Sequence, residues 1–397
     1  MTLIFDKRNE LQDQPAFHVL IAGVSAYPHL PGGSGEPAEE SFGMQQLSSA
    51  ALTAYKIYCW LLEQQNNLPI PLATIRLLLS PSPVEVGVES QLSGLVDVCT
   101  RRNFALAAHD WRKDASFNSD SITFFYFAGH GVQRSKDDAV LLVENFGDPV
   151  EAPLTNAVSM GNIFYGMASS NSRLKMAQTQ LYFVDACRNF PSKFKDFERM
   201  TVPDVFPVEL TGRDNRRAPI FYASIADSKA YAIKGEETLF SKALLDCLSN
   251  IAGEPGEEDS QGEVKWFVSV YSLGKALEYS LQKLNKERGA DQDCTFGGHF
   301  KDTLIVFRDR PPSVDLILEV EPTVALDFTR MEVRNGRKVV SRIKAPIKPH
   351  PYLLSLPAGN YKIIAKVEPS NPAYREYKSQ PRPLMPPYKR WQVRMIL

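Results

Sequence analysis

Short apolar runs that alternate with helical segments constrain the fold of this chain more than any other sequence feature. Each run is rich in β-branched or aromatic residues and stops at a turn, which is typical of a strand buried on both faces of a parallel sheet. The runs span residues 17–27, 73–79, 121–131, 179–189, 218–224 and 302–308. Strands that alternate with helices predict an α/β domain with a mostly parallel sheet flanked by helices.

The segments between these runs show apolar residues at helical spacing, so amphipathic helices are expected there. These segments span residues 44–65, 100–115, 157–169, 240–250 and 271–287. A β-hairpin arm is expected near residues 139–144.

The pattern changes after the segment RDRPPS at residues 308–313. From Val314 onward no helical period remains, and apolar strands are separated by Pro and Gly, as in the turn-forming sequence LPAGNY. A small all-β sandwich of about 80 residues fits this pattern. We therefore expect a first, α/β domain over residues 1–308 and a β-sandwich accessory domain over residues 314–397.

The charge balance excludes a strong overall field around the protein. The chain holds 45 basic and 46 acidic residues, which gives a net charge of −1. Such a protein has no general attraction for nucleic acid or for an anionic membrane surface. No run of about 18 apolar residues that could cross a membrane appears either. We therefore expect neither nucleic acid nor a membrane among its partners.

The cysteines are few and far apart. They are Cys59, Cys99, Cys187, Cys247 and Cys294, with no CxxC pair and no Cys/His cluster at metal-ligand spacing. This pattern disfavours both a disulfide framework and a zinc site, and we expect no metal and no cofactor. Because sparse free thiols fit a reducing compartment and the first residues show no signal-peptide pattern, we expect a cytoplasmic protein.

His130 and Cys187 are the residues that point most clearly to chemistry. Each stands at the end of a predicted strand, and active sites on parallel sheets lie beyond the carboxyl ends of the strands. If the two strands are neighbours, an imidazole and a thiol face each other at one edge of the sheet. That pair suits thiol catalysis, in which the imidazole assists formation of the thiolate and later protonates the leaving amine.

Glycines on both sides of His130 strengthen this interpretation. Gly129 and Gly131 let the chain turn sharply and expose a backbone N–H next to the imidazole. The N–H of Gly131, with that of Cys187, can bind the oxyanion of a tetrahedral intermediate. We therefore include Gly131 among the candidate catalytic residues.

The segments FFYFAGHG and YFVDACRN, which contain His130 and Cys187, resemble the caspase-like cysteine peptidases (peptidase C14), in particular bacterial and metacaspase-like members. The spacing of the two residues is comparable with the roughly 50 residues of the caspase signature. AGVSAYP resembles the first strand of the family, IFYASIADSKAY the strand and loop that line the specificity pocket, and FSKALLDCL the next helix. The resemblance covers residues 15–308 and implies a caspase-like fold with cysteine endopeptidase activity.

Asp185 stands where a caspase has glutamine, two residues before the nucleophile. An acidic residue there resembles metacaspases and related peptidases, in which it lies in the pocket for the residue before the cut. A partly buried carboxylate pairs with guanidinium or ammonium and repels an aspartate side chain. The resemblance thus implies a protein substrate cut after Arg, with Lys second, and not after Asp. Asp227 is a second substrate-binding candidate for the same pocket.

The basic segment over residues 191–217 has two interpretations. Relatives are often processed in this region, so an enzyme that cuts after Arg can cut itself there, with RDNRRAP at residues 213–219 as the first candidate. The segment can equally be a solvated loop in an uncut chain, and an activating protease or partner is a further alternative.

Three functions from different classes stay open. The first is an active peptidase with a Cys187/His130 dyad, in regulated proteolysis or bacterial antiviral defence signalling. The second is a catalytically silent caspase-fold scaffold or binding protein, in which Cys187 is a small buried residue and Asp185 a hydrogen-bonding one. The third gives the main role to the C-terminal β domain as a docking module. Some relatives need calcium, but no D-x-D-x-D-G loop is present.

Overall fold

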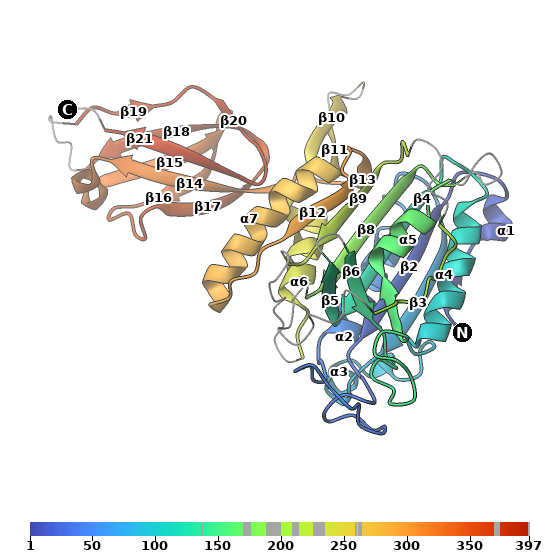
Figure 1. Ribbon diagram of the computed structural model, residues 1–397. Helices are drawn as coiled ribbons and strands as arrows, with labels where there is room; N and C mark the ends of the chain where they lie inside the picture. The colour runs from blue at the N-terminus through green and yellow to red at the C-terminus, as the bar shows by residue number, and fades with distance from the viewer. Residues whose placement is uncertain are drawn as a thin grey trace. The chain divides into compact units, whose positions relative to one another are not determined.

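The computed structural model describes residues 1–135, 138–169, 176–187, 200–208, 214–224, 235–258, 260, 264–368 and 374–395. The chain divides into two compact units (Figure 1). The first unit comprises Met1–Leu245 with Ser280–Ile305, and the second comprises Asp246–Tyr279 with Val306–Leu397. The domain boundary at residues 308–314 stays a prediction.

The first unit is built around a seven-stranded sheet in the order β1-β3-β2-β4-β8-β9-β12. The strands between β1 and β12 run parallel, and these two edge strands run antiparallel to their neighbours. The strands are β1 (Leu3–Asp6), β2 (Phe17–Val24), β3 (Leu72–Ser80), β4 (Ile122–Gly129), β8 (Thr179–Ala186), β9 (Ala218–Tyr222) and β12 (Thr295–His299). The predicted α/β fold with a mostly parallel sheet is confirmed.

The central strands are mostly apolar because they have no solvent face. Every residue of β2, β3, β4 and β8 is buried. Two outer strands differ from the prediction. The glycine-containing sequence TFGGH forms the edge strand β12, and β13 (Leu304–Arg308) joins β10 (Glu254–Glu258) and β11 (Val264–Ser269) in a separate three-stranded sheet.

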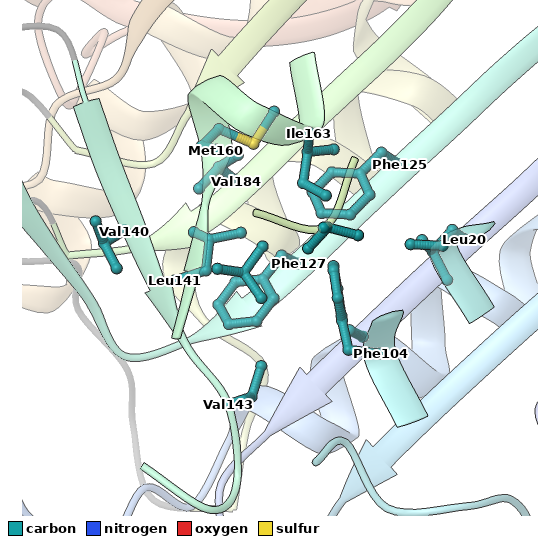
Figure 2. Close-up of a cluster of buried hydrophobic side chains, with 14 of the residues drawn as sticks. Leu20, Phe104, Phe125, Phe127, Val140, Leu141, Val143, Met160, Ile163 and Val184 are labelled. Carbon is teal, nitrogen blue, oxygen red and sulfur yellow. The ribbon is translucent and has the colours of Figure 1, made fainter. Parts of the chain in front are cut away.

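Helices cover both faces of the large sheet. On one face, α4 (Arg101–Ala115) and α5 (Met160–Gly166) share a hydrophobic core with the strands. Figure 2 shows Leu20, Phe125 and Val184 of this core beside Phe104 and Ile163. On the other face, α2 packs closely against β2.

The close approach of α2 (Ala50–Glu63) depends on Gly23 near the end of β2. A Cβ atom at Gly23 would lie 2.5 Å from the Cβ of Ala54, too close for any side chain. Because successive strand residues point to opposite faces, Gly23 faces away from the core that contains Leu20. The carboxyl end of β2 therefore meets the N-terminal turns of α2.

The helix predicted over residues 44–65 begins only at Ala50. The preceding residues form a loop, because the Gln46 side chain accepts a hydrogen bond from the Tyr27 backbone N–H and donates to the Tyr27 carbonyl. The helix predicted over residues 157–169 is also shorter, since β7 (Ala157–Ser159) precedes α5. The remaining helices are α1 (Arg8–Leu11), α3 (Pro83–Val88), α6 (Leu239–Asp246) and α7 (Val270–Arg288).

A small antiparallel sheet follows β4 directly. It contains β5 (Gly131–Ser135), β6 (Asp138–Leu142) and β7, in the order β5-β6-β7. The predicted hairpin arm near residues 139–144 corresponds to β6. Because His130 is the one residue between β4 and β5, this sheet fixes the direction in which the chain leaves β4.

The second unit contains two β-sheets that share one core. One sheet has the order β17-β14-β21, and the other has the order β16-β15-β18-β19, with β20 paired to β18. Leu316 of β14, Met331 of β15 and Trp391 of β21 belong to the same buried cluster, as expected for sheets packed face to face. The strands are β14 (Ser313–Glu321), β15 (Thr329–Asn335), β16 (Lys338–Ile343), β17 (Tyr352–Pro357), β18 (Gly359–Val367), β19 (Tyr377–Lys378), β20 (Arg382–Leu384) and β21 (Tyr388–Arg394). The predicted β-rich C-terminal region is confirmed.

Candidate active site

His130 and Cys187 directly follow two neighbouring strands of the large sheet. The strands β4 and β8 are parallel neighbours, and their last paired residues are Gly129 and Ala186. His130 and Cys187 are the next residues of the two strands, and both line one cavity of about 300 Å³. The structure thus brings together the imidazole and the thiol that the sequence placed at two strand ends.

The imidazole of His130 is held by a backbone carbonyl. Its Nε2 lies 2.7 Å from the carbonyl oxygen of Gln45. Since a carbonyl oxygen can only accept, Nε2 carries the proton, and Nδ1 is the nitrogen left to accept one. Burial lowers the pKa of His130, and the hydrogen bond to Gln45 opposes this effect only in part. The ring is therefore neutral near pH 7, the form that a general base requires.

The backbone of His130 is positioned by the hydroxyl of Tyr27. The N–H of His130 donates to that hydroxyl at 2.8 Å, and the hydroxyl donates to the carbonyl of Leu142 at 3.1 Å. The two rings also pack together, with centroids 4.9 Å apart. Burial raises the pKa of Tyr27 well above its ordinary value, so the hydroxyl keeps its proton. Sequence reasoning missed Tyr27, because its contacts come from segments far apart in the chain.

The loop that contains Gln45 is fixed to the end of β2. The Tyr27 N–H donates to Gln46 Oε1 at 2.8 Å, and Gln46 Nε2 donates to the Tyr27 carbonyl at 2.7 Å. The Leu47 N–H donates to the carbonyl of Ser25 at 2.9 Å. These bonds place the Gln45 carbonyl against the imidazole. They could not be predicted from the sequence, since a helix was expected over these residues.

Gly131 lies against the backbone of Cys187. A Cβ atom at Gly131 would lie 2.7 Å from the Cys187 carbonyl oxygen, so the position excludes any side chain without a backbone shift. The Leu142 N–H donates to the His130 carbonyl, and Gly131 pairs with Leu141. Because hydrogen-bonded and non-hydrogen-bonded pairs alternate along antiparallel strands, the N–H of Gly131 points away from β6. It is therefore not used in the pairing of β5 with β6.

Cys187 is the partly buried cysteine that lines the cavity, and Cys59, on α2, is partly buried too. Cys99, Cys247 and Cys294 are buried, and none of the five cysteines forms a disulfide. A partly buried thiol at a cavity can be reached by a substrate.

Asp185 is a buried carboxylate in the same cavity. It is 2% exposed, and its Oδ2 accepts hydrogen bonds from the hydroxyl of Tyr126 at 2.9 Å and from the hydroxyl of Thr238. Its Oδ1 is buried and has no hydrogen-bond partner among the described residues. Burial raises the pKa of Asp185 to about 6, against the opposing effect of the Thr238 and Tyr126 hydrogen bonds. The other substrate-binding candidate, Asp227, lies outside the described residues.

Neither a metal-ligand cluster nor a membrane-spanning helix occurs in the described part of the chain. Within it, no three His, Cys, Asp or Glu side chains lie close enough together to hold a metal ion. The helices in the same part of the chain are too short or too polar to cross a membrane.

The segment RDNRRAP at residues 213–219, predicted as a self-cleavage site, is described from residue 214 onward. Hydrogen bonds fix its two central arginines. Arg216 is 1% exposed and donates to the carboxylate of Asp214 and to Gln180 Oε1. The backbone of Arg217 exchanges hydrogen bonds with Gln178 and Gln180. The bond after Arg216 is therefore not accessible in the folded protein. Lys193, Lys195, Arg199 and Arg213 lie outside the described residues.

Comparisons with known proteins identify one matching family. A family model, Peptidase_C14, described as a caspase domain, matches residues 83–294, which include His130, Asp185 and Cys187. An uncharacterized protein, y4kE, of Sinorhizobium fredii is 29% identical over 276 residues, which cover 66% of this chain and 73% of that protein. The crystal structure of protein GSU0716 from Geobacter sulfurreducens, at 14% identity and a TM-score of 0.41, covers 71% of this chain and 93% of its own.

Proposed function

Because this chain belongs to the Peptidase_C14 family of caspase domains, a family of cysteine peptidases, we propose that it is an endopeptidase that cuts after arginine and, second, after lysine. The observation that carries this proposal is the shared cavity of the Cys187 thiol, the His130 imidazole and the buried Asp185 carboxylate. Cys187 is the proposed nucleophile and His130 the proposed base. Asp185 gives the proposed preference for a basic side chain.

The catalytic cycle begins with a proton transfer from the Cys187 thiol to Nδ1 of His130. The thiolate then attacks the carbonyl carbon of the substrate, and the resulting oxyanion accepts hydrogen bonds from the N–H groups of Gly131 and Cys187. When the C–N bond breaks, the imidazolium gives its proton to the leaving amine, and a thioester remains on Cys187. His130 next takes a proton from water, the hydroxide attacks the thioester, and the acid product leaves with the thiol regenerated.

The specificity follows from the unpartnered oxygen of Asp185. An arginine guanidinium that enters the cavity would donate to Oδ1 and complete the hydrogen bonding of the carboxylate. A substrate aspartate at that place would bring a second negative charge next to Asp185 in a buried setting, which is strongly unfavourable. Asp227 is proposed as a second acidic group toward the same side chain.

The biological role we propose is regulated proteolysis, with bacterial defence signalling as its setting. In that role residues 1–308 form the peptidase and residues 314–397 an accessory β-sandwich that docks a partner. The functional alternative is a silent scaffold that acts through the accessory domain. The His130 imidazole held by the Gln45 carbonyl, the partly buried Cys187 thiol at the cavity and the Gly131 N–H that is not used by β6 favour the active peptidase.

A panel of fluorogenic peptides that differ only in the residue before the cut tests the proposal. Arginine, lysine, glutamine and aspartate peptides are assayed with the wild type and with Cys187→Ala, with calcium and with a chelator. We expect turnover in the order Arg, Lys and then the rest, and none from Cys187→Ala. Turnover of the aspartate peptide equal to that of the arginine peptide would refute the specificity. Absence of all thiol-dependent turnover would favour the scaffold.

A further inference from the structure

Thr238 contacts the carboxylate of Asp185, the proposed specificity residue, but has no role in the catalytic scheme. It is 6% exposed, precedes α6 and lines the cavity that holds Cys187. Its hydroxyl donates to Asp185 Oδ2 and accepts a hydrogen bond from the backbone N–H of Ser241 at 3.1 Å. The same oxygen thus caps the first turn of α6 and contacts the carboxylate.

Thr238 is itself fixed from two sides. Its backbone N–H donates to the hydroxyl of Thr53 on α2 at 3.1 Å, and its side chain is tied to α6 through Ser241. A β-branched side chain also has few accessible χ1 rotamers. The hydroxyl is therefore presented to Asp185 in one orientation.

Two donors on one oxygen fix the orientation of the Asp185 carboxylate. The terminal torsion of an aspartate is broad, so a free carboxylate would rotate and share its oxygens between both directions. Tyr126 and Thr238 both donate to Oδ2, and Oδ1 is left without a partner among the described residues. A basic side chain of the substrate would then bind to Oδ1, whose position is fixed before the substrate enters.

We infer that Thr238 is a specificity-determining positioning residue, whose hydroxyl holds one oxygen of Asp185 so that the other receives the basic side chain of the substrate. This inference rests on the proposed function, because it assigns the supporting group for the proposed arginine pocket. It predicts that loss of one hydroxyl weakens recognition of the substrate charge while the Cys187 and His130 chemistry stays intact.

The Thr238 hydroxyl also keeps Asp185 charged. A hydrogen bond to a carboxylate lowers its pKa, so removal of the hydroxyl raises the pKa of Asp185 above about 6. Other titratable groups near it are Tyr126 on β4, whose pKa burial raises well above its ordinary value, and His130 and Cys187 in the cavity. Glu237, the neighbour of Thr238, is paired with Lys56 of α2.

The test compares Thr238→Val with Thr238→Ser, which keeps the hydroxyl. The readout is the ratio of kcat/KM for a peptide with arginine before the cut to kcat/KM for the same peptide with citrulline, its neutral isostere. We expect Thr238→Val to lower this ratio roughly tenfold or more, since it removes a hydrogen bond to a charged group. Thr238→Ser should keep the wild-type ratio, and so should the matched control Thr123→Val, whose buried hydroxyl has no hydrogen-bond partner among the described residues.

A second measurement separates this inference from the proposed function. The titration of Asp185 is followed by 13C NMR of labelled aspartate carboxyls in the Cys187→Ala background, with the signal assigned by its absence from Asp185→Asn. We expect a midpoint near pH 6 with threonine or serine at position 238 and a higher midpoint with valine. An unchanged midpoint and an unchanged arginine-to-citrulline ratio in Thr238→Val would overturn the role of Thr238. A wild type without preference for arginine would refute the arginine pocket, and with it the specificity role, whatever the titration shows.

Discussion

The substitution Asp185→Asn should make the folded protein more stable and at the same time remove its preference for arginine. Asp185 is 2% exposed, and its Oδ1 has no partner among the described residues. The pKa of this carboxyl rises from 3.8 to about 6 on folding. Its ionised form therefore destabilises the folded protein by about 3 kcal/mol at neutral pH. Asparagine has no charge to bury. Its carbonyl can accept from Tyr126 and Thr238, which leaves an amide NH2 group toward the cavity.

Asp185→Asn should raise the free energy of unfolding by less than about 3 kcal/mol, because the unpaired amide group of the asparagine is itself destabilising. A buried polar group without a partner costs about 1 kcal/mol or more, so the net gain is about 2 kcal/mol at pH 7.5. The pH dependence follows from the two pKa values. Folded Asp185 holds its proton more tightly than the unfolded chain does, so the destabilisation is fully present above about pH 6 and disappears as the pH falls toward 3.8.

Urea unfolding of the wild type and of Asp185→Asn at pH 7.5, 6 and 4 measures this difference. The exposed Asp120→Asn variant is a matched control for the loss of a negative charge at the surface. We expect the variant to exceed the wild type in free energy of unfolding at pH 7.5 and to lose this advantage by pH 4. In the peptide assay, kcat/KM for arginine should fall about 100-fold or more, because a guanidinium would enter without its counter-charge. A variant that is less stable than the wild type at every pH would refute the argument that Asp185 is a buried, incompletely partnered carboxylate.

Two further variants test how the catalytic groups are held. Gly131→Ala should lower kcat about 100-fold with little change in KM, because its Cβ would lie 2.7 Å from the Cys187 carbonyl oxygen and displace an oxyanion donor. Gly161→Ala, whose Cβ would have no neighbour closer than 3.5 Å, is its control, and equal kcat values for the two variants would contradict the assignment. Tyr27→Phe should lower both kcat and the free energy of unfolding, the latter by about 1–3 kcal/mol, since the His130 N–H and the Leu142 carbonyl both lose a partner. Kinetics with thermal melting checks this, and a variant with wild-type kcat would show that Tyr27 does not position the base.

The parallel sheet and the pair His130 and Cys187 could be predicted from the sequence, because both depend on local signals. A continuous apolar run indicates a strand without a solvent face, and a polar residue just after such a run lies at the carboxyl edge of the sheet. The register of β4 and β8 then places His130 next to Cys187.

The groups that support the site could not be predicted, because each depends on contacts between distant segments. Gln46 belongs to an apolar pattern that suggested a helix, yet its amide bonds to the backbone of Tyr27 and keeps the segment in a loop. Thr238 follows no motif, and only the fold brings it to Asp185. Arg216 belongs to a basic segment that was interpreted as either a self-cleavage site or a solvated loop, whereas its guanidinium is buried against Asp214 and Gln180. Local composition does not show when a polar side chain has such a partner.

Covalent labelling tests the central claim most directly. A peptidyl-arginine acyloxymethyl ketone alkylates a thiolate only after its arginine side chain has bound beside it, and intact-mass and peptide mass spectrometry then locate the adduct. We expect one adduct on Cys187, formed at least about tenfold faster than with the matched aspartate reagent and slowed by His130→Ala. Labelling spread over the other cysteines, or equal rates for the arginine and aspartate reagents, would contradict the assignment of Cys187 as the nucleophile of an arginine-specific peptidase.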